Sequence, residues 1–147
     1  MTTVHIIVGS VLGASEYVAD ALSDKLISLG YQTKIHLDPK LKEIPTSGFW
    51  LLCSSTHGAG ELPDNIQPFA DELTKVQLNN VSFWVVSLGD SSYDTFCQGG
   101  AQLHKLMVET NAKALANPLE IDVLQHPIPE EFALEWINNN QALFQNL

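Results

Sequence analysis

Residues 3–9 read TVHIIVG, a short run rich in β-branched residues that ends at a glycine. Such a run is typical of a buried strand that leads into a loop. Residues 15–29 follow with apolar side chains three and four positions apart, and Gly30 stands where a glycine commonly ends a helix. This stretch therefore predicts a strand, a loop and a helix in succession, as in the first part of a parallel βαβ unit.

The same alternation continues to the end of the chain. Further strands are predicted at 31–37, 49–55, 81–89 and 119–124, and further helices at 63–76, 96–111 and 129–147. The second helix is predicted to begin at Pro63, because a proline in the first turn loses no needed hydrogen bond. Buried strands that alternate with helices form a parallel sheet covered on both faces. We expect one α/β domain over residues 1–147, with a doubly wound, five-stranded parallel sheet.

Composition and charge exclude several classes of partner. The 147 residues are 45% hydrophobic, and 7 Lys+Arg against 17 Asp+Glu give a formal net charge of -10. This charge repels nucleic acids and anionic lipids, so neither is expected as a partner. No leader or spanning segment is recognised, which predicts a cytoplasmic protein. The spacing of Cys53 and Cys97 favours neither a disulfide framework nor a zinc site, so both are expected to be reduced packing thiols.

Three loops are candidates for a ligand site. Ligands of doubly wound sheets bind beyond the carboxyl ends of the strands, where the strand order reverses. This rule selects residues 9–15, 54–65 and 88–97, which follow the first, third and fourth predicted strands.

The first of these loops, GSVLGAS at 9–15, passes directly into a helix amino terminus. Unpaired N–H groups and the helix dipole attract an anion there, and the hydroxyls of Ser10 and Ser15 add donors. The next cation is Lys25, about 15 Å further along a helix, so neutral dipoles alone would hold a phosphate. The alternative is a plain strand-to-helix turn with serine capping. The glycine spacing fits neither a dinucleotide fingerprint nor a P-loop.

The other two loops suit a flat aromatic ligand. Two glycines flank Ala59 in SSTHGAGELPDN at 54–65, and such a backbone can approach a ligand closely. Tyr93 stands in the polar turn LGDSSYDTFC at 88–97, where an exposed ring can stack on a ligand. The alternative is that Tyr93 only covers its own loop.

SSTHGAGELPDN at 54–65 and SLGDSSYDTFC at 87–97 closely resemble the two flavin-ring loops of the flavodoxin family, which are also found in the FMN modules of diflavin reductases. The resemblance covers nearly the whole chain and is greatest to the small, free-standing members of the MioC type. It implies a flavodoxin-like sheet with strand order 2-1-3-4-5 and noncovalently bound FMN. It also implies an electron carrier, not an enzyme with its own substrate. Such a carrier would shuttle single electrons from an NADPH-dependent flavin reductase to redox or radical enzymes, as a monomer or weak dimer.

The residues that the resemblance assigns to the cofactor come from all three loops. They are Ser10, Val11, Leu12, Gly13, Ala14, Ser15, Thr56, His57, Gly58, Ala59, Gly60, Leu88, Gly89, Asp90, Tyr93, Phe96 and Cys97. By this resemblance, residues 10–15 would hold the phosphate, 56–60 would border the flavin ring, and 88–97 would close over its other side. Tyr93 matches the stacking tyrosine of the family. No catalytic residue or metal ligand is implied.

Two positions depart from the family pattern. Leu12 stands where many flavodoxins have a phosphate-binding threonine, and His57 replaces the aromatic residue usual on the inner face of the ring. These departures leave open a flavodoxin-like interaction module that has lost or weakened FMN binding. An enzyme such as a quinone reductase is disfavoured, because no candidate NAD(P)H site is found. The fifth predicted strand has no long polar interruption, which favours the short-chain flavodoxin pattern.

Overall fold

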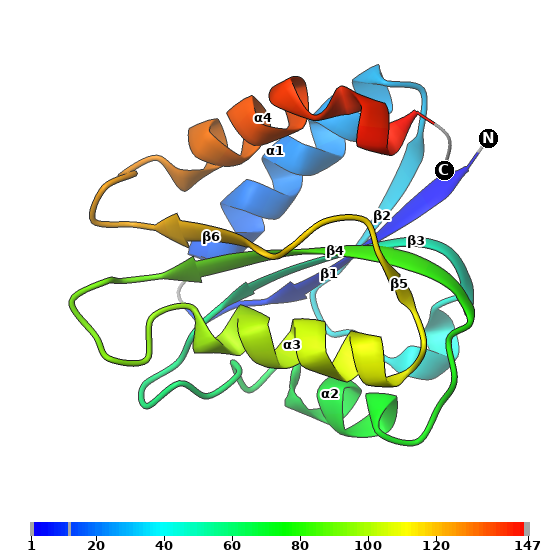
Figure 1. The fold of residues 1–147 in the computed structure, drawn as a ribbon, viewed down its shortest axis with the longest axis horizontal. Coiled ribbons are helices and arrows are strands. Elements are labelled where there is room, and N and C mark those ends of the chain that lie inside the picture. Colours follow the sequence, from blue (N-terminus) through cyan, green and yellow to red (C-terminus); the bar gives the residue numbers. More distant parts are fainter. Residues whose placement is uncertain (1, 12, 146–147) are drawn as a thin grey trace.

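The predicted strands form one parallel sheet in the computed structural model, which describes residues 2–11 and 13–145. Its strands are β1 (Thr3–Gly9), β2 (Gln32–His36), β3 (Ser47–Ser55), β4 (Asn80–Gly89), β5 (Lys113–Ala114) and β6 (Leu119–Asp122). Their order is β2-β1-β3-β4-β5, and β6 also pairs with β4 (Figure 1). The order and the parallel pairing confirm the expected doubly wound α/β fold.

The fifth position of the sheet differs from the prediction, because two short strands occupy it in succession. β5 pairs with Ser82 and Phe83 of β4, and β6 pairs with Val86 to Gly89 further along the same strand. Pro118 lies immediately before β6, and proline has no N–H to donate to a neighbouring strand. A single strand over 119–124 therefore describes only the second part of this edge.

Helices cover both faces of the sheet. They are α1 (Ala14–Ser28), α2 (Gln67–Leu73), α3 (Gln98–Glu109) and α4 (Pro129–Asn139), with short 3-10 turns at η1 (Leu41–Glu43) and η2 (Gln141–Phe144). α1 and α4 lie on one face, and α2 and α3 on the other (Figure 1). None of the helices in the described part of the chain is long and apolar enough to cross a membrane.

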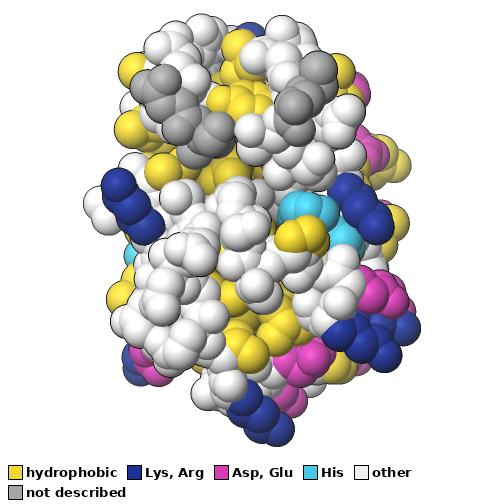
Figure 2. All heavy atoms as spheres, turned by 90° about the vertical axis from the view of Figure 1, so that its right-hand side faces the viewer, with side chains coloured by type: hydrophobic (Ala, Val, Ile, Leu, Met, Phe, Trp, Pro, Cys, Tyr) yellow, Lys and Arg dark blue, Asp and Glu magenta, His cyan; other side chains and the backbone are white. Residues whose placement is uncertain are grey.

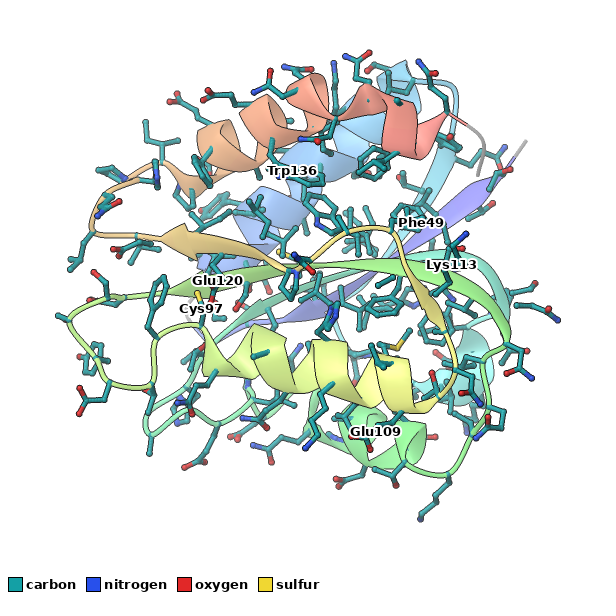
Figure 3. All side chains as sticks on the ribbon, in the orientation of Figure 1. Phe49, Cys97, Glu109, Lys113, Glu120 and Trp136 are labelled. Carbon is teal, nitrogen blue, oxygen red and sulfur yellow. The ribbon has the colours of Figure 1, made fainter. Side chains whose placement is uncertain are left out.

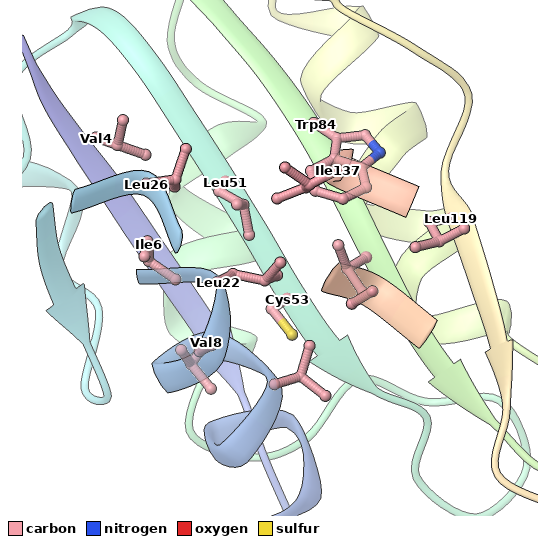
Figure 4. Packing of buried hydrophobic residues seen from close by; sticks show 14 of the residues in the cluster. Val4, Ile6, Val8, Leu22, Leu26, Leu51, Cys53, Trp84, Leu119 and Ile137 are labelled. Atoms are coloured by element: carbon pink, nitrogen blue, oxygen red, sulfur yellow. The ribbon is translucent and has the colours of Figure 1, made fainter. Parts of the chain in front are cut away.

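The two faces of the sheet have separate cores, because side chains alternate along each strand. Val4, Ile6 and Val8 of β1 pack beneath α1 and α4 (Figure 4). Ile7 of the same strand joins the cluster under α2 and α3. Each face of β1 is therefore buried, as the continuous apolar run predicted.

Local end signals account for the helix boundaries. Gly30 adopts φ 100° after α1, and the N–H of Tyr31 returns to the carbonyl of Leu26 at 3.1 Å, as expected of a glycine-ended helix.

The prediction that the second helix begins at Pro63 was wrong. In such a helix Pro68 would stand in the interior, where its ring clashes with the preceding turn. Residues 63–66 instead form a turn, and α2 begins beside Pro68.

The parallel register brings the candidate loops together. Gly9 at the end of β1 pairs with Ser54, and Ser55 at the end of β3 pairs with Leu88. The loops that follow β1, β3 and β4 therefore leave the same edge of the sheet. The start of β1 and the η2 turn lie at the opposite end (Figure 1), the face shown in Figure 2, where lysines lie around the margin.

Candidate functional site

Two cavities open where these three loops meet. The first, of about 250 Å³, is lined by Val11, Ala14, Ser55, Thr56, His57, Gly58, Leu88, Gly89, Asp90 and Val123. The second, of about 210 Å³, is lined by Thr56, Gly58, Gly89, Asp90, Tyr93, Thr95 and Cys97. Four residues line both, so the cavities adjoin. Together they make a slot at the carboxyl edge of the sheet, the place where such folds bind ligands.

One wall of the slot is a narrow glycine hairpin. The N–H of His57 donates to the carbonyl of Glu61 at 2.7 Å, and the N–H of Glu61 returns to the carbonyl of His57 at 2.8 Å. Gly58 and Gly60 turn the chain with φ values of 48° and 95°, in the left-handed region that glycine adopts without strain. A Cβ at Gly58 would meet nothing within 4 Å, so the backbone is open to a close ligand there.

Three hydrogen bonds attach alternate residues of this loop to α3 and to the loop that precedes it. The N–H of Gly99 donates to the hydroxyl of Thr56 at 3.0 Å, and the hydroxyl of Thr95 donates to the carbonyl of Gly58 at 3.3 Å. The side-chain amide of Gln102 donates to the carbonyl of Gly60. The glycine hairpin is thus attached to the start of α3, so the two ring loops form a connected unit.

The opposite wall carries Tyr93, a residue that is 63% exposed. Its N–H donates to the carbonyl of Asp90 at 3.1 Å, and the carboxylate of Asp90 accepts the N–H of Ser92 at 2.8 Å. These bonds close the turn while the ring remains free on the surface. Tyr93 is therefore placed to cover a flat ligand in the slot.

Asp122, at the end of β6, ties the Tyr93 loop to the next loop of the chain. Its carboxylate accepts the N–H of Ser91 at 3.2 Å and that of Leu124 at 3.0 Å. A side-chain hydrogen bond from Ser91, these N–H groups and nearby His126 lower the pKa of Asp122, against an opposing effect of desolvation. The ionised carboxylate therefore braces both loops.

Two side chains of the loop after β1 form hydrogen bonds within it. The hydroxyl of Ser10 accepts the N–H of Gly13 at 2.9 Å, and the buried hydroxyl of Ser15 donates to the carbonyl of Gly9 at 2.7 Å. The Ser15 hydroxyl, expected to be a phosphate donor, is thus already bonded within the protein. The remaining donors for an anion are the hydroxyl hydrogen of Ser10 and the backbone N–H groups at the start of α1. The expectation for Leu12 lies outside the described residues.

The structure brings ten of the implied cofactor residues to the slot. Those that line neither cavity are Ser10, Gly13, Ser15, Ala59, Gly60 and Phe96. Ala59 and Gly60 border a separate cavity against α2 and α3. Cys97 lines the slot but is buried, and desolvation, the largest influence on it, raises the pKa of its thiol to about 11. A thiol of this kind serves packing, as the sequence predicted.

Three lining residues are absent from the implied cofactor set: Ser55 and Thr95, which lie within two of the predicted loops, and Val123, which lies outside all three. Val123 follows β6, which runs parallel to β4, so the rule that ligands lie beyond strand ends applies to its loop too. That rule, extended to the fifth strand, would have found it.

Acidic residues dominate the four segments nearest the slot. The segments 9–16, 55–65, 89–98 and 122–131 contain Glu16, Glu61, Asp64, Asp90, Asp94, Asp122, Glu130 and Glu131, and no lysine. The slot therefore lies in a negative field. Among the described residues, no group of three or more His, Cys, Asp or Glu side chains is arranged to hold a metal ion.

The chain is similar to flavodoxins in both sequence and structure. A family model described as Flavodoxin matches residues 6–136. Protein MioC of Escherichia coli (strain K12) is 41% identical over 141 residues, covering 95% of this chain and 96% of that protein. A solved cysteine-to-alanine mutant of the flavodoxin from Pseudomonas aeruginosa is 34% identical with a TM-score of 0.83, covering 97% of this chain and 98% of that one.

A longer protein also matches. The sulfite reductase (NADPH) flavoprotein alpha-component of Shewanella sp. (strain ANA-3) is 36% identical over 126 residues, which cover 82% of this chain and 21% of that protein. Together these matches confirm the resemblance that the two ring loops predicted.

Proposed function

The chain belongs to the flavodoxin family of FMN-type electron carriers, and from this premise we propose that it binds FMN noncovalently in the slot at the carboxyl edge of its sheet. Bound FMN would supply reversible electron transfer through its flavin ring. The observation that carries the proposal is the convergence of the loops after β1, β3 and β4 on two adjoining cavities.

The residues of the slot fit such a cofactor. Tyr93 offers an exposed aromatic face on one side, and the hairpin at His57 and Gly58 borders the other. The open space at the Cβ position of Gly58 lets a planar ring approach the backbone. The amino terminus of α1 supplies N–H groups and a dipole for the phosphate, and the lysine of this helix, Lys25, lies in its last turn.

We further propose the partners of this carrier. An NADPH-dependent flavin reductase would deliver electrons, and redox or radical enzymes would accept them. The acidic residues around the slot would attract partners that carry basic patches. The protein itself would supply binding, orientation and electrostatics rather than a substrate site of its own.

Absorption spectroscopy and fluorescence titration test the proposal. The purified protein should show a flavin band, or the apoprotein should regain it with FMN. FMN should bind at least tenfold more tightly than riboflavin, because only FMN places a phosphate at the start of α1. Equal affinities would contradict the phosphate site. Failure to bind either flavin would favour the interaction module, which the presence of His57 in the ring hairpin keeps as the second candidate.

A further inference from the structure

Asn65, a half-buried residue at the end of the loop after β3, joins three segments that are distant in sequence. Its side-chain oxygen accepts the N–H of Ser10 at 3.0 Å. Its side-chain nitrogen donates to the carbonyl of Val8 at 2.7 Å and to the carbonyl of Leu37 at 2.9 Å. One carboxamide thus connects the ends of β1 and β2 with the loop after β3.

These bonds fix the orientation of the carboxamide. If its oxygen and nitrogen were exchanged, the oxygen would face two carbonyl oxygens and the nitrogen an N–H group. Both donors and the acceptor are satisfied only in the observed orientation. Asn65 therefore acts as a specific connector rather than as a generic polar side chain.

Asn65 holds the chain on both sides of Gly9, the last residue of β1. Val8 precedes Gly9 and Ser10 follows it, and both are bonded to the same carboxamide. Ser10 passes the constraint on, since its hydroxyl accepts the N–H of Gly13 immediately before α1. The path from Asn65 through Ser10 to Gly13 sets where the amino terminus of α1 lies relative to the strand ends.

We propose that Asn65 is a positioning residue for the phosphate of the cofactor, an inference that rests on the proposed function. The Ser10 N–H is paired with Asn65, so it is not a donor to the phosphate. Asn65 acts instead through the backbone of residues 8–13, which it holds in the conformation that aims the first N–H groups of α1. The flavin ring would lie against the hairpin at 57–61, which precedes Asn65 in the same loop and has its own hydrogen bonds to α3, so riboflavin binding should depend little on this path.

Two variants of Asn65 distinguish the positioning role from an effect of charge and from a general loss of stability. Asn65→Ser removes the connector without adding charge, and Asn65→Asp keeps an acceptor for Ser10 but places a carboxylate against the carbonyls of Val8 and Leu37. Asn79→Asp, at an exposed asparagine before β4, is the matched charge control. Dissociation constants are measured for FMN and for riboflavin by fluorescence titration.

Both Asn65 variants should bind FMN at least tenfold more weakly and riboflavin within threefold of wild type, while Asn79→Asp should match wild type for both. If wild type itself fails to prefer FMN, the phosphate site of the proposed function is wrong. If wild type prefers FMN and either Asn65 variant keeps that preference, or loses affinity for both flavins equally, the positioning role is overturned.

Hydrogen exchange on the wild-type apoprotein provides a second test that needs no variant. The amides of Ser10 and Gly13 should exchange at least tenfold more slowly than the exposed amide of Gly58, whose N–H lies in the open hairpin. Equally fast exchange at Ser10 would show that the bond to Asn65 does not persist, and would overturn the proposal even if the variants fail to fold.

Discussion

The hydroxyl of Thr95 donates a hydrogen bond of 3.3 Å to the carbonyl oxygen of Gly58, 37 residues away in the sequence. Thr95 belongs to the loop that carries Tyr93, and Gly58 to the glycine hairpin on the other side of the slot. The two walls around the proposed flavin ring are therefore connected directly as well as through the sheet. A change on one wall should affect the geometry of the other.

Thr95→Val tests this connection, because it removes the donor and keeps the shape of the side chain. FMN should bind roughly 0.5–1.5 kcal/mol more weakly, the usual net contribution of one hydrogen bond. Thr95→Ser keeps the hydroxyl and should bind FMN as wild type does. Fluorescence titration measures both variants, and equal affinity in Thr95→Val and wild type would mean that the bond does not position the hairpin.

Tyr93→Ala should weaken FMN binding by about 1–3 kcal/mol, if stacking on the flavin resembles the stacking of aromatic residues on nucleic-acid bases. Tyr93→Phe retains the ring and is the matched control, with an affinity close to that of wild type. The dissociation constant measures the effect. An unchanged dissociation constant for FMN in Tyr93→Ala would indicate that the Tyr93 side chain only covers its own loop.

Gly58→Ala and Gly48→Ala form a matched pair, because both glycines have positive φ and open space at the Cβ position. Each substitution should lower the free energy of unfolding by about 1–2 kcal/mol through backbone strain. Only Gly58→Ala should also weaken FMN binding, since Gly58 lines both cavities and Gly48 lies at the start of β3. Urea unfolding and FMN titration separate the effects. Equal FMN affinity in the two variants would place the ring away from the hairpin.

The acidic residues around the slot should steer a basic partner. Asp94→Lys with Glu61→Lys should slow reduction by a flavin reductase roughly tenfold at low salt while FMN stays bound. Reduction of wild type should itself slow as salt rises, because screening limits the field to about 8 Å at physiological ionic strength. Stopped-flow rates across a salt series measure both effects.

A control for this pair carries the same change of net charge far from the slot. Glu109→Lys with Asp24→Lys serves, since both acids are exposed and Glu109 ends α3 at the opposite side from Cys97 (Figure 3). This control should be reduced almost as fast as wild type. A flat salt profile, or equal slowing in both double variants, would mean that partners dock elsewhere.

The buried pair His5 and His36 should make stability depend on pH. Nδ1 of His5 lies 3.0 Å from Nε2 of His36, and both residues are less than 8% exposed. Burial, with a smaller contribution from Lys34, lowers the pKa of His5. Burial lowers the pKa of His36 as well, with His5 and Lys34 acting in the same direction and Glu43 opposing them.

Both imidazoles are therefore neutral in the folded protein at a pH where the unfolded chain, with values near 6.5, binds protons. The unfolded state then binds more protons, so the free energy of unfolding should fall as the pH drops below about 6.5 toward the folded pKa values. The free energy of unfolding, measured with denaturant between pH 7 and 5, should depend less steeply on pH in His36→Gln, and less steeply still when His5→Gln is added. An identical pH dependence in wild type and the double variant would contradict this.

Local patterns in the sequence were enough for the separate elements. The run at 3–9 predicted β1 with its observed bounds, and Gly30 marked the end of α1, because an apolar period and a glycine turn depend only on neighbouring residues. The start of α2 is also marked in the sequence, by Pro68 rather than by Pro63. The two ring loops identified the family, since their motifs are contiguous in the chain.

The tertiary structure alone decided which distant groups meet. Asn65 bonds to Val8, Ser10 and Leu37, and the hydroxyl of Thr95 bonds to the carbonyl of Gly58. These contacts depend on the register of strands that are far apart in the chain and on which way each polar side chain turns. A short sequence pattern carries no such information. A hydrogen bond depends on the positions of both partners, whereas a pattern describes only the segment in which one of them lies.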